Sequence, residues 1–161
     1  MNTQWQLYYE CNKLLDDAFD KKYGNIPDMH EKNCIELLIE LGEFINESKC
    51  FKYWSIKKPD INNLYEEAAD VMQMILYFYN YYGIVRLTLP KLEMTDNVID
   101  EINYLYIDAS RLLKNGNKKL CKKIFCRFMH IINLLNMNEV DLLNACYKKN
   151  TINYERLNSN Y

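Results

Sequence analysis

The sequence predicts an all-α protein, a bundle of about six helices in a single domain over residues 1–161. The chain has 161 residues, an ordinary length for one domain with its own core. Hydrophobic residues make up 49% of it and charged residues 26%, which is too apolar a mixture for a disordered chain. Only 4 glycines and 3 prolines are present, too few for the many turns of an all-β fold. The fold class that remains consistent with this composition is one of long helices with few connections.

Breaks in the sequence separate the expected helices. Gly, Pro, Asn, Asp or Ser gather at residues 24–28, 55–60, 89–90 and 115–117. The helices expected between and after these breaks are, in chain order, 3 to 23, 30 to 50, 60 to 83, 95 to 114, 118 to 135 and 138 to 149.

Two of these helices have clear end signals. In the third, Asp60 is placed as an N-cap and Gly83 as a C-terminal stop. The last begins at Asn138 with Asp141 three residues on, an imperfect capping box. Apolar residues recur in the third at the three- and four-residue spacing of one helix face: Leu64, Val71, Met74, Ile75 and Phe78.

Charge and composition exclude several kinds of partner. Lys plus Arg (20) against Asp plus Glu (22) gives a net charge of −2, so the molecule has no basic excess for nucleic acid or an anionic membrane. Charged or amide residues interrupt every apolar run before the roughly 18 residues of a membrane span. Six cysteines without a CxxC pair, and no leader segment, predict a cytoplasmic protein with reduced thiols.

The second predicted helix has an acidic row. Its members lie within an arc of about 60° at about 100° per residue. On one helix alone, such a row is more often a solvated face than a site. The row consists of Glu36, Glu40, Glu43 and Glu47.

The third predicted helix makes a site the better interpretation. Glu67 and Asp70 share the apolar side of that helix with Met74, and the helix has no Lys or Arg. Carboxylates removed from water must be paired with cations, protonated or bound to metal. Glu40-x-x-Glu43 and Glu67-x-x-Asp70 lie on consecutive helices joined by a short loop, so the four carboxylates are expected to converge.

An all-oxygen cluster of this kind suits Mg²⁺, with Mn²⁺ as a possible substitute. Zinc and di-iron sites are disfavoured because only His30 and His130 are present, and neither belongs to a Glu-x-x-His motif. Gly42, inside the ExxE motif, costs about 1 kcal/mol against alanine in mid-helix. It therefore needs a reason, either close packing of another helix or close approach of a ligand.

These motifs resemble a known family. ExxE followed by ExxD on adjacent helices is similar to the all-α nucleoside triphosphate pyrophosphohydrolases of the MazG-like superfamily. Residues 38–47 (LIELGEFINE) and 50–55 (CFKYWS) resemble more narrowly the ELGE-x-x-NE and FK-x-W signatures of the dimeric dUTPases. Residues 145–156 (ACYKKNTINYER) resemble that family's C-terminal AY-x-x-KN-x-x-N-x-x-R motif.

The resemblance implies a homodimeric dUTP diphosphatase that hydrolyses dUTP to dUMP and pyrophosphate with Mg²⁺ as cofactor, with dUDP as a second candidate substrate. It implies magnesium ligands at Glu40, Glu43, Glu67 and Asp70, with Glu43 orienting the attacking water. It implies substrate contacts from Asn12, Asn46 and Trp54 to the base, Asn150 to the deoxyribose, Lys149 and Arg156 to the phosphates, and Tyr161 closing the site.

Several departures from the family pattern concern base recognition more than metal chemistry. Asn12 replaces a glutamine, Gln73 a frequent histidine, and Asn160 a glycine, and Leu157 stands where RQ is usual. The alternatives are a pyrophosphohydrolase of different or broader base preference, and a catalytically silent nucleotide- or protein-binding regulator. A packing role for Trp54 also remains open. The polar residues 150–161 follow the last predicted helix and are expected to form a mobile lid.

Overall fold

The computed structural model describes residues 3–24 and 26–159, and all regular elements among them are helices. The predicted all-α fold is confirmed. The helices are α1 (Thr3–Tyr23), α2 (Met29–Ser48), α3 (Ile61–Tyr81), α4 (Val98–Ser110), α5 (Leu112–Asn115), α6 (Lys118–Leu134) and α7 (Glu139–Asn158).

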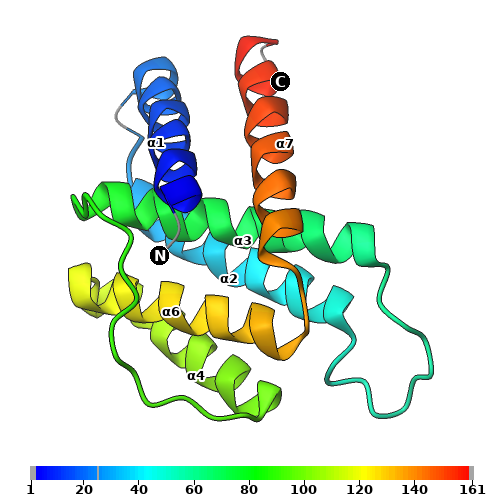
Figure 1. The fold of residues 1–161 in the computed structure, drawn as a ribbon. Coiled ribbons are helices and arrows are strands. Elements are labelled where there is room, and N and C mark those ends of the chain that lie inside the picture. Colours follow the sequence, from blue (N-terminus) through cyan, green and yellow to red (C-terminus); the bar gives the residue numbers. More distant parts are fainter. Residues whose placement is uncertain (1–2, 25, 160–161) are drawn as a thin grey trace.

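Helix α3 is the centre of the arrangement (Figure 1). It packs against α1, α2, α6 and α7, while α4 packs against α2 and α6. Helices α2, α3, α4 and α6 form a base, and the paired helices α1 and α7 rise from the α3 side of it. Because α1 and α7 contact each other as well as α3, the two ends of the chain meet over the same central helix.

Side-chain caps explain where most of the helices begin. Asp60 accepts hydrogen bonds from the backbone N–H groups of Asn62 and Asn63, as its position in the sequence predicts. Asparagine takes the same role ahead of three further helices: Asn97 for α4, Asn117 for α6 and Asn138 for α7. Each cap satisfies N–H groups that the first helical turn leaves without a partner.

The core lies between α3 and the helices around it and is rich in aromatic rings. Phe44 of α2 contacts Phe128 of α6 edge-on at 5.5 Å between ring centroids, and Tyr79 of α3 contacts Phe125 of α6 at 5.4 Å. All four residues are fully buried. These contacts fix the separation of α2, α3 and α6, and thereby the position of the acidic row on α2.

A buried ion network joins α4 to α6. Arg127 Nε donates to Asp108 Oδ2 at 3.0 Å, and Arg127 Nη1 donates to Glu101 Oε2 at 2.5 Å. Lys123 Nζ donates to Asp108 Oδ1 at 2.9 Å. Each buried carboxylate thus has a cation, which is the condition under which buried charges are tolerated.

Two helices differ from the predicted boundaries. The predicted helix over 95 to 114 is broken at Arg111 into α4 and α5. The predicted helix over 138 to 149 continues to Asn158, so most of residues 150–161, expected as a mobile lid, is helical here. None of the helices in the described part of the chain combines the length and apolar character that a membrane span needs.

Candidate active site

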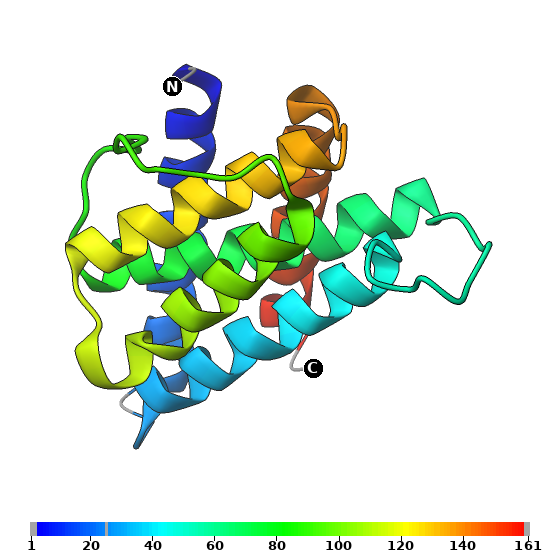
Figure 2. The ribbon, with the colours of Figure 1, turned by 90° about the horizontal axis from the view of Figure 1, so that it is seen from below.

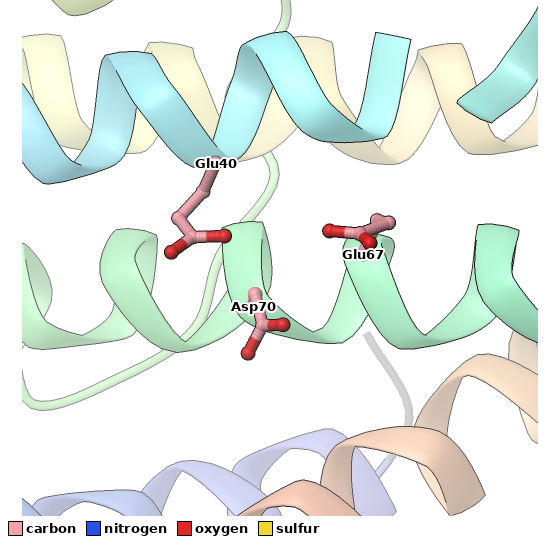
Figure 3. Close-up of side chains that lie close together, drawn as sticks. All are labelled: Glu40, Glu67 and Asp70. Carbon is pink, nitrogen blue, oxygen red and sulfur yellow. The ribbon is translucent and has the colours of Figure 1, made fainter. Parts of the chain in front are cut away.

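Three carboxylates from α2 and α3 converge where the two helices pack together. Oxygen atoms of Glu40, Glu67 and Asp70 all lie within 4.8 Å of one another. Figure 3 shows the side chains of Glu40, from α2, and of Glu67 and Asp70, from α3, close together. Glu43 lines the same cavity one helical turn from Glu40. Three of the four carboxylates expected to converge thus meet in the structure, and Glu43 lines the cavity beside them.

The environment of these carboxylates disfavours their charged forms. Partial burial, followed by the neighbouring Asp70, raises the pKa of Glu40 to about 7. Burial also raises the pKa of Glu67, with Glu43 contributing, and the pKa of Asp70, although Lys149 opposes that second shift. Carboxylates that lie close together and have raised pKa values hold protons more tightly. A hard divalent cation that prefers oxygen ligands would bind such a group in place of the protons.

Basic residues of α7 face this cluster. Lys149 Nζ donates to Asp70 Oδ2 at 2.6 Å. The Arg156 guanidinium is close enough to lower the pKa of Asp70. Lys148, the neighbour of Lys149, pairs instead with the exposed Glu66 at 2.8 Å, outside the cavity. Consecutive positions on one helix thus place one lysine in the site and one on the surface.

The carboxylates and basic residues line one cavity of about 510 Å³. Its walls come from α1, α2, α3 and α7, so residues near both ends of the chain enclose it. A hydrophobic part is provided by Phe19, Tyr23 and Met74. An acidic floor opposite cations suits a phosphate chain bound with a metal ion.

A second cavity, of about 270 Å³, adjoins the first and is less polar. Phe19, Gln73 and Asn153 are among the residues that line both cavities. Asn12 lines the second cavity and is buried, yet neither atom of its amide has a hydrogen-bond partner among the described residues. A buried amide without hydrogen-bond partners costs folding free energy, so a ligand group or a water molecule is expected to supply the missing hydrogen bonds.

The cavities contain many of the residues predicted from the sequence. The first brings together Glu40, Glu43, Glu67, Asp70, Lys149 and Arg156, and the second holds Asn12.

Other predicted residues lie elsewhere. Asn46 and Trp54 are exposed and line neither cavity, and Asn46 Oδ1 accepts a hydrogen bond from Lys52 at 2.6 Å. Asn150 is buried on α7, where its amide nitrogen has no partner among the described residues. Tyr161 lies outside the described residues.

Asn153, Gln73 and Asp16 also line the cavities and are not among the site residues predicted from the sequence. Asn153 Nδ2 donates to Gln73 Oε1 at 2.8 Å, where the two cavities meet, and Arg156 Nη1 donates to Asn153 Oδ1 at 3.4 Å. Asp16 lines the second cavity. For Asn153 a signal existed, because it occurs in the C-terminal motif four residues after Lys149 and three before Arg156. Continued helix would place all three on one face.

Comparison with protein families decides between the enzyme classes that such a cavity could serve. A family model described as dUTPase matches residues 4–161, nearly the whole chain. The chain belongs to the dUTPase family. The all-helical fold is consistent with the all-α type of that family. A search of curated proteins finds no match.

This dUTPase is accordingly a nucleotide diphosphohydrolase that acts on dUTP. The two cavities suit the two parts of a nucleotide. The first presents charged groups to the phosphates, and the second is less polar and has room for the nucleoside. The carboxylate cluster also fits the divalent metal that the family suggests.

Proposed function

We propose that this dUTPase depends on Mg²⁺ and that Glu40, Glu43, Glu67 and Asp70 hold the ion. The observation that carries the proposal is the convergence of Glu40, Glu67 and Asp70 oxygens within 4.8 Å, opposite Lys149. Carboxylate oxygen without nitrogen or sulfur ligands favours Mg²⁺, or Mn²⁺ as a substitute, over zinc or copper. A bound divalent ion would supply charge neutralisation at the phosphates and a more acidic water.

Glu43 is the proposed catalytic base. It lines the phosphate cavity, is exposed to solvent, and lies one helical turn from Glu40. From that position it accepts a proton from the attacking water and orients the water towards the phosphate chain. The products are dUMP and pyrophosphate.

The remaining contacts proposed between the protein and the nucleotide are based on which charged and polar groups line each cavity. Lys149 and Arg156 bind phosphate oxygens, which balances the negative charge brought by the nucleotide. The unpartnered amide of Asn12 offers both a donor and an acceptor to the uracil edge. Asn150 is proposed for the deoxyribose, Asn46 and Trp54 for the base, and Tyr161 for closure.

Some features of the proposal extend beyond the cavity. The protein acts as a homodimer in the cytoplasm, as one domain, and can also accept dUDP. Residues 150–161 act as the lid. Because α7 is helical to Asn158, this lid moves as part of a helix end, pivoting with Arg156 when phosphate is bound.

The test is pyrophosphate release from dUTP, dCTP, dTTP, dATP and UTP, with and without Mg²⁺. Wild type should prefer dUTP and lose activity without the metal. Glu43→Gln should lose at least about 100-fold, as expected for removal of a general base. The matched control is Glu66→Gln, which changes a carboxylate of α3 that points away from the cavity and should keep wild-type activity. Equal activity with EDTA would disprove the metal dependence.

A further inference from the structure

One ionisable group of the second cavity has no role in the proposed function. Asp16 lies on α1 four residues after Asn12, and both side chains line this cavity between α1, α2 and α3. Figures 1 and 2 both show α1 crossing α3 at a steep angle, so that one face of α1 is turned towards the helices it crosses. Because residues four apart share a helix face, the Asn12 amide and the Asp16 carboxyl are neighbours in the cavity.

Asp16 has one carboxyl oxygen that is held and one that is available. Asn80 Nδ2 donates to Asp16 Oδ2 at 3.4 Å, and the described residues offer no hydrogen bond to Oδ1. Asn80 lies ten residues after Asp70 on α3, which is about 15 Å along the helix. Asp16 is therefore at the end of the second cavity that lies away from the carboxylate cluster.

The charged groups among the described residues that line the second cavity are all acidic: Asp16, Asp20 and Glu36. Burial, with Asp20 and Asp17 contributing, raises the pKa of Asp16 to about 8, although the hydrogen bond from Asn80 opposes the shift. Tyrosines from three helices are also near Asp16, and burial raises the pKa of each, so they remain uncharged: Tyr9 of α1, Tyr77 of α3 and Tyr154 of α7. The Asp16 carboxyl is thus neutral at neutral pH and ionised above about pH 8.

Uracil and cytosine differ at position 4 of the ring. Uracil has a carbonyl oxygen there, which accepts a hydrogen bond, and cytosine has an amino group, which donates one. The Asn12 amide alone distinguishes them poorly, because a half-turn of the amide exchanges its donor and its acceptor. A carboxyl group beside it distinguishes them by its protonation state. The neutral form donates to the uracil oxygen, and the ionised form accepts from the cytosine amino group.

The arrangement of the two cavities places position 4 near Asp16. A nucleotide with its phosphates in the first cavity has its sugar where the cavities meet, beside Gln73 and Asn153. Position 4 is on the side of a pyrimidine ring that faces away from the sugar. It is therefore directed to the end of the second cavity at which Asp16 lies, and Asn12 is left for the ring nitrogen next to it.

We propose that Asp16 selects the base, and that its ionised form admits cytosine, which gives this dUTPase a second activity on dCTP. The inference rests on the proposed function, because dCTP would use the same phosphate site and undergo the same reaction. One water is consumed, the bond between the α- and β-phosphates breaks, and dCMP and pyrophosphate leave. Neither base is altered, so the protonation of Asp16 affects only which nucleotide binds productively.

The first test measures kcat/KM for dUTP and for dCTP with Mg²⁺ from about pH 6 to about pH 8.5. Both nucleotides depend on the same metal ligands and general base, so the titration of those groups cancels in the ratio of the two values. If uracil requires the neutral carboxyl and cytosine the ionised one, the ratio of dUTP to dCTP falls up to about tenfold per pH unit. A constant ratio, or no detectable dCTP hydrolysis at about pH 8.5, would overturn the proposal.

Two variants assign the pH dependence to Asp16. Asp16→Asn cannot titrate, so its ratio should be independent of pH, while dUTP is still hydrolysed because an amide also donates to a carbonyl oxygen. Asp17→Asn is the matched control, since this neighbouring carboxyl is exposed and lines neither cavity. It should keep the slope of wild type. An unchanged slope in Asp16→Asn, with circular dichroism showing a folded protein, would contradict the assignment.

The second test uses wild type and requires no catalysis. Calorimetric titration with dUMP and with dCMP at about pH 8, in two buffers of different ionisation enthalpy, gives the number of protons exchanged on binding. Binding of dUMP should take up protons onto Asp16 and binding of dCMP should release them, so the two numbers differ by up to about one proton. The phosphate group contributes equally to both. Equal numbers for the two nucleotides would overturn the proposal.

The two tests separate this inference from the proposed function. Metal-dependent dUTP hydrolysis with a constant ratio retains the proposed chemistry and removes the role of Asp16. A wild-type enzyme without metal-dependent dUTP hydrolysis loses the proposed function, while the proton numbers for dUMP and dCMP still decide the role of Asp16.

Discussion

Lys149 Nζ lies 2.6 Å from Asp70 Oδ2, so an ammonium group of α7 already neutralises one member of the carboxylate cluster on α2 and α3. This contact engages a carboxylate that is also proposed to bind the metal ion. The same lysine is proposed to bind phosphate. Binding of metal and nucleotide therefore requires Lys149 to exchange Asp70 for a phosphate oxygen, which links the two binding events.

Replacing Lys149 should separate metal binding from nucleotide binding. We expect Lys149→Met to bind Mn²⁺ more tightly than wild type in the absence of nucleotide, because a competing positive charge is gone. Its KM for dUTP should rise about 10- to 100-fold, the usual cost of a charge-assisted hydrogen bond. Titration calorimetry with Mn²⁺ and steady-state kinetics measure the two effects. The control is Lys148→Met, which removes the surface pair with Glu66; equal effects from both variants would contradict the prediction.

Removing one carboxylate from the cluster should stabilise the protein while abolishing its response to metal. Glu40 is crowded by Asp70, Glu43 and Glu36, and its charge is disfavoured by burial. In metal-free buffer at pH 8, Glu40→Gln should therefore melt at a higher temperature than wild type. The increase in Tm that Mg²⁺ with dUMP gives to wild type should be lost. Differential scanning fluorimetry with and without EDTA measures both, and Glu66→Gln is the control expected to behave as wild type.

Asp16 should give a separate pH dependence of stability. Burial raises the pKa of this carboxyl to about 8, with Asp20 and Asp17 contributing, although Asn80 Nδ2 donates to it. A raised pKa stabilises the folded state fully below the unfolded value, about 4, and the contribution is lost as the pH rises towards 8. Asp16→Asn should thus equal wild type near pH 4 and become the more stable of the two by pH 8. Urea unfolding at several pH values checks this, and a constant difference across the range would refute it.

The α4–α6 ion network predicts a large effect on stability at a distance from the cavity. Arg127→Met leaves the buried Glu101 and Asp108 short of positive charge and should cost about 3–5 kcal/mol of unfolding free energy. Arg111→Met removes only a longer contact of 3.6 Å from a largely exposed side chain and should cost under about 1 kcal/mol. Urea denaturation measures both, and similar losses for the two variants would rule out a special role of the buried network.

The sequence alone was sufficient for the helices that bury an apolar face. In α3 the apolar spacing and the Asp60 cap predicted the element to within about two residues at each end. The second half of α7 was missed because its inner face looks into a polar cavity. Asn153 and Arg156 line that cavity and Asn150 is a buried polar residue, so hydrophobic periodicity contains little signal there. The break at Arg111 likewise has no marker of glycine or proline.

For the site, spacing along two helices was enough to predict that Glu40, Glu67 and Asp70 meet, because consecutive helices joined by one loop pack together. It could not predict which loops reach the cavity. Whether Trp54 contacts its own cavity or that of another copy depends on tertiary and quaternary geometry, to which local sequence patterns are insensitive. The pairing of Asn153 with Gln73 is similarly a contact between distant helices.

The enclosure of the cavity by residues near both ends of the chain affects how the protein folds. The α2–α3 hairpin brings the carboxylates together through local contacts, whereas Phe19 and Arg156 join the same cavity only after a long stretch of intervening chain has been ordered. Contacts of such sequence separation form late and slowly, because the loop-closure entropy must be overcome first. During refolding, the helical circular dichroism signal should therefore recover before the ability to bind nucleotide. The delay between the two would measure how long α7 takes to pack against α1 and α3.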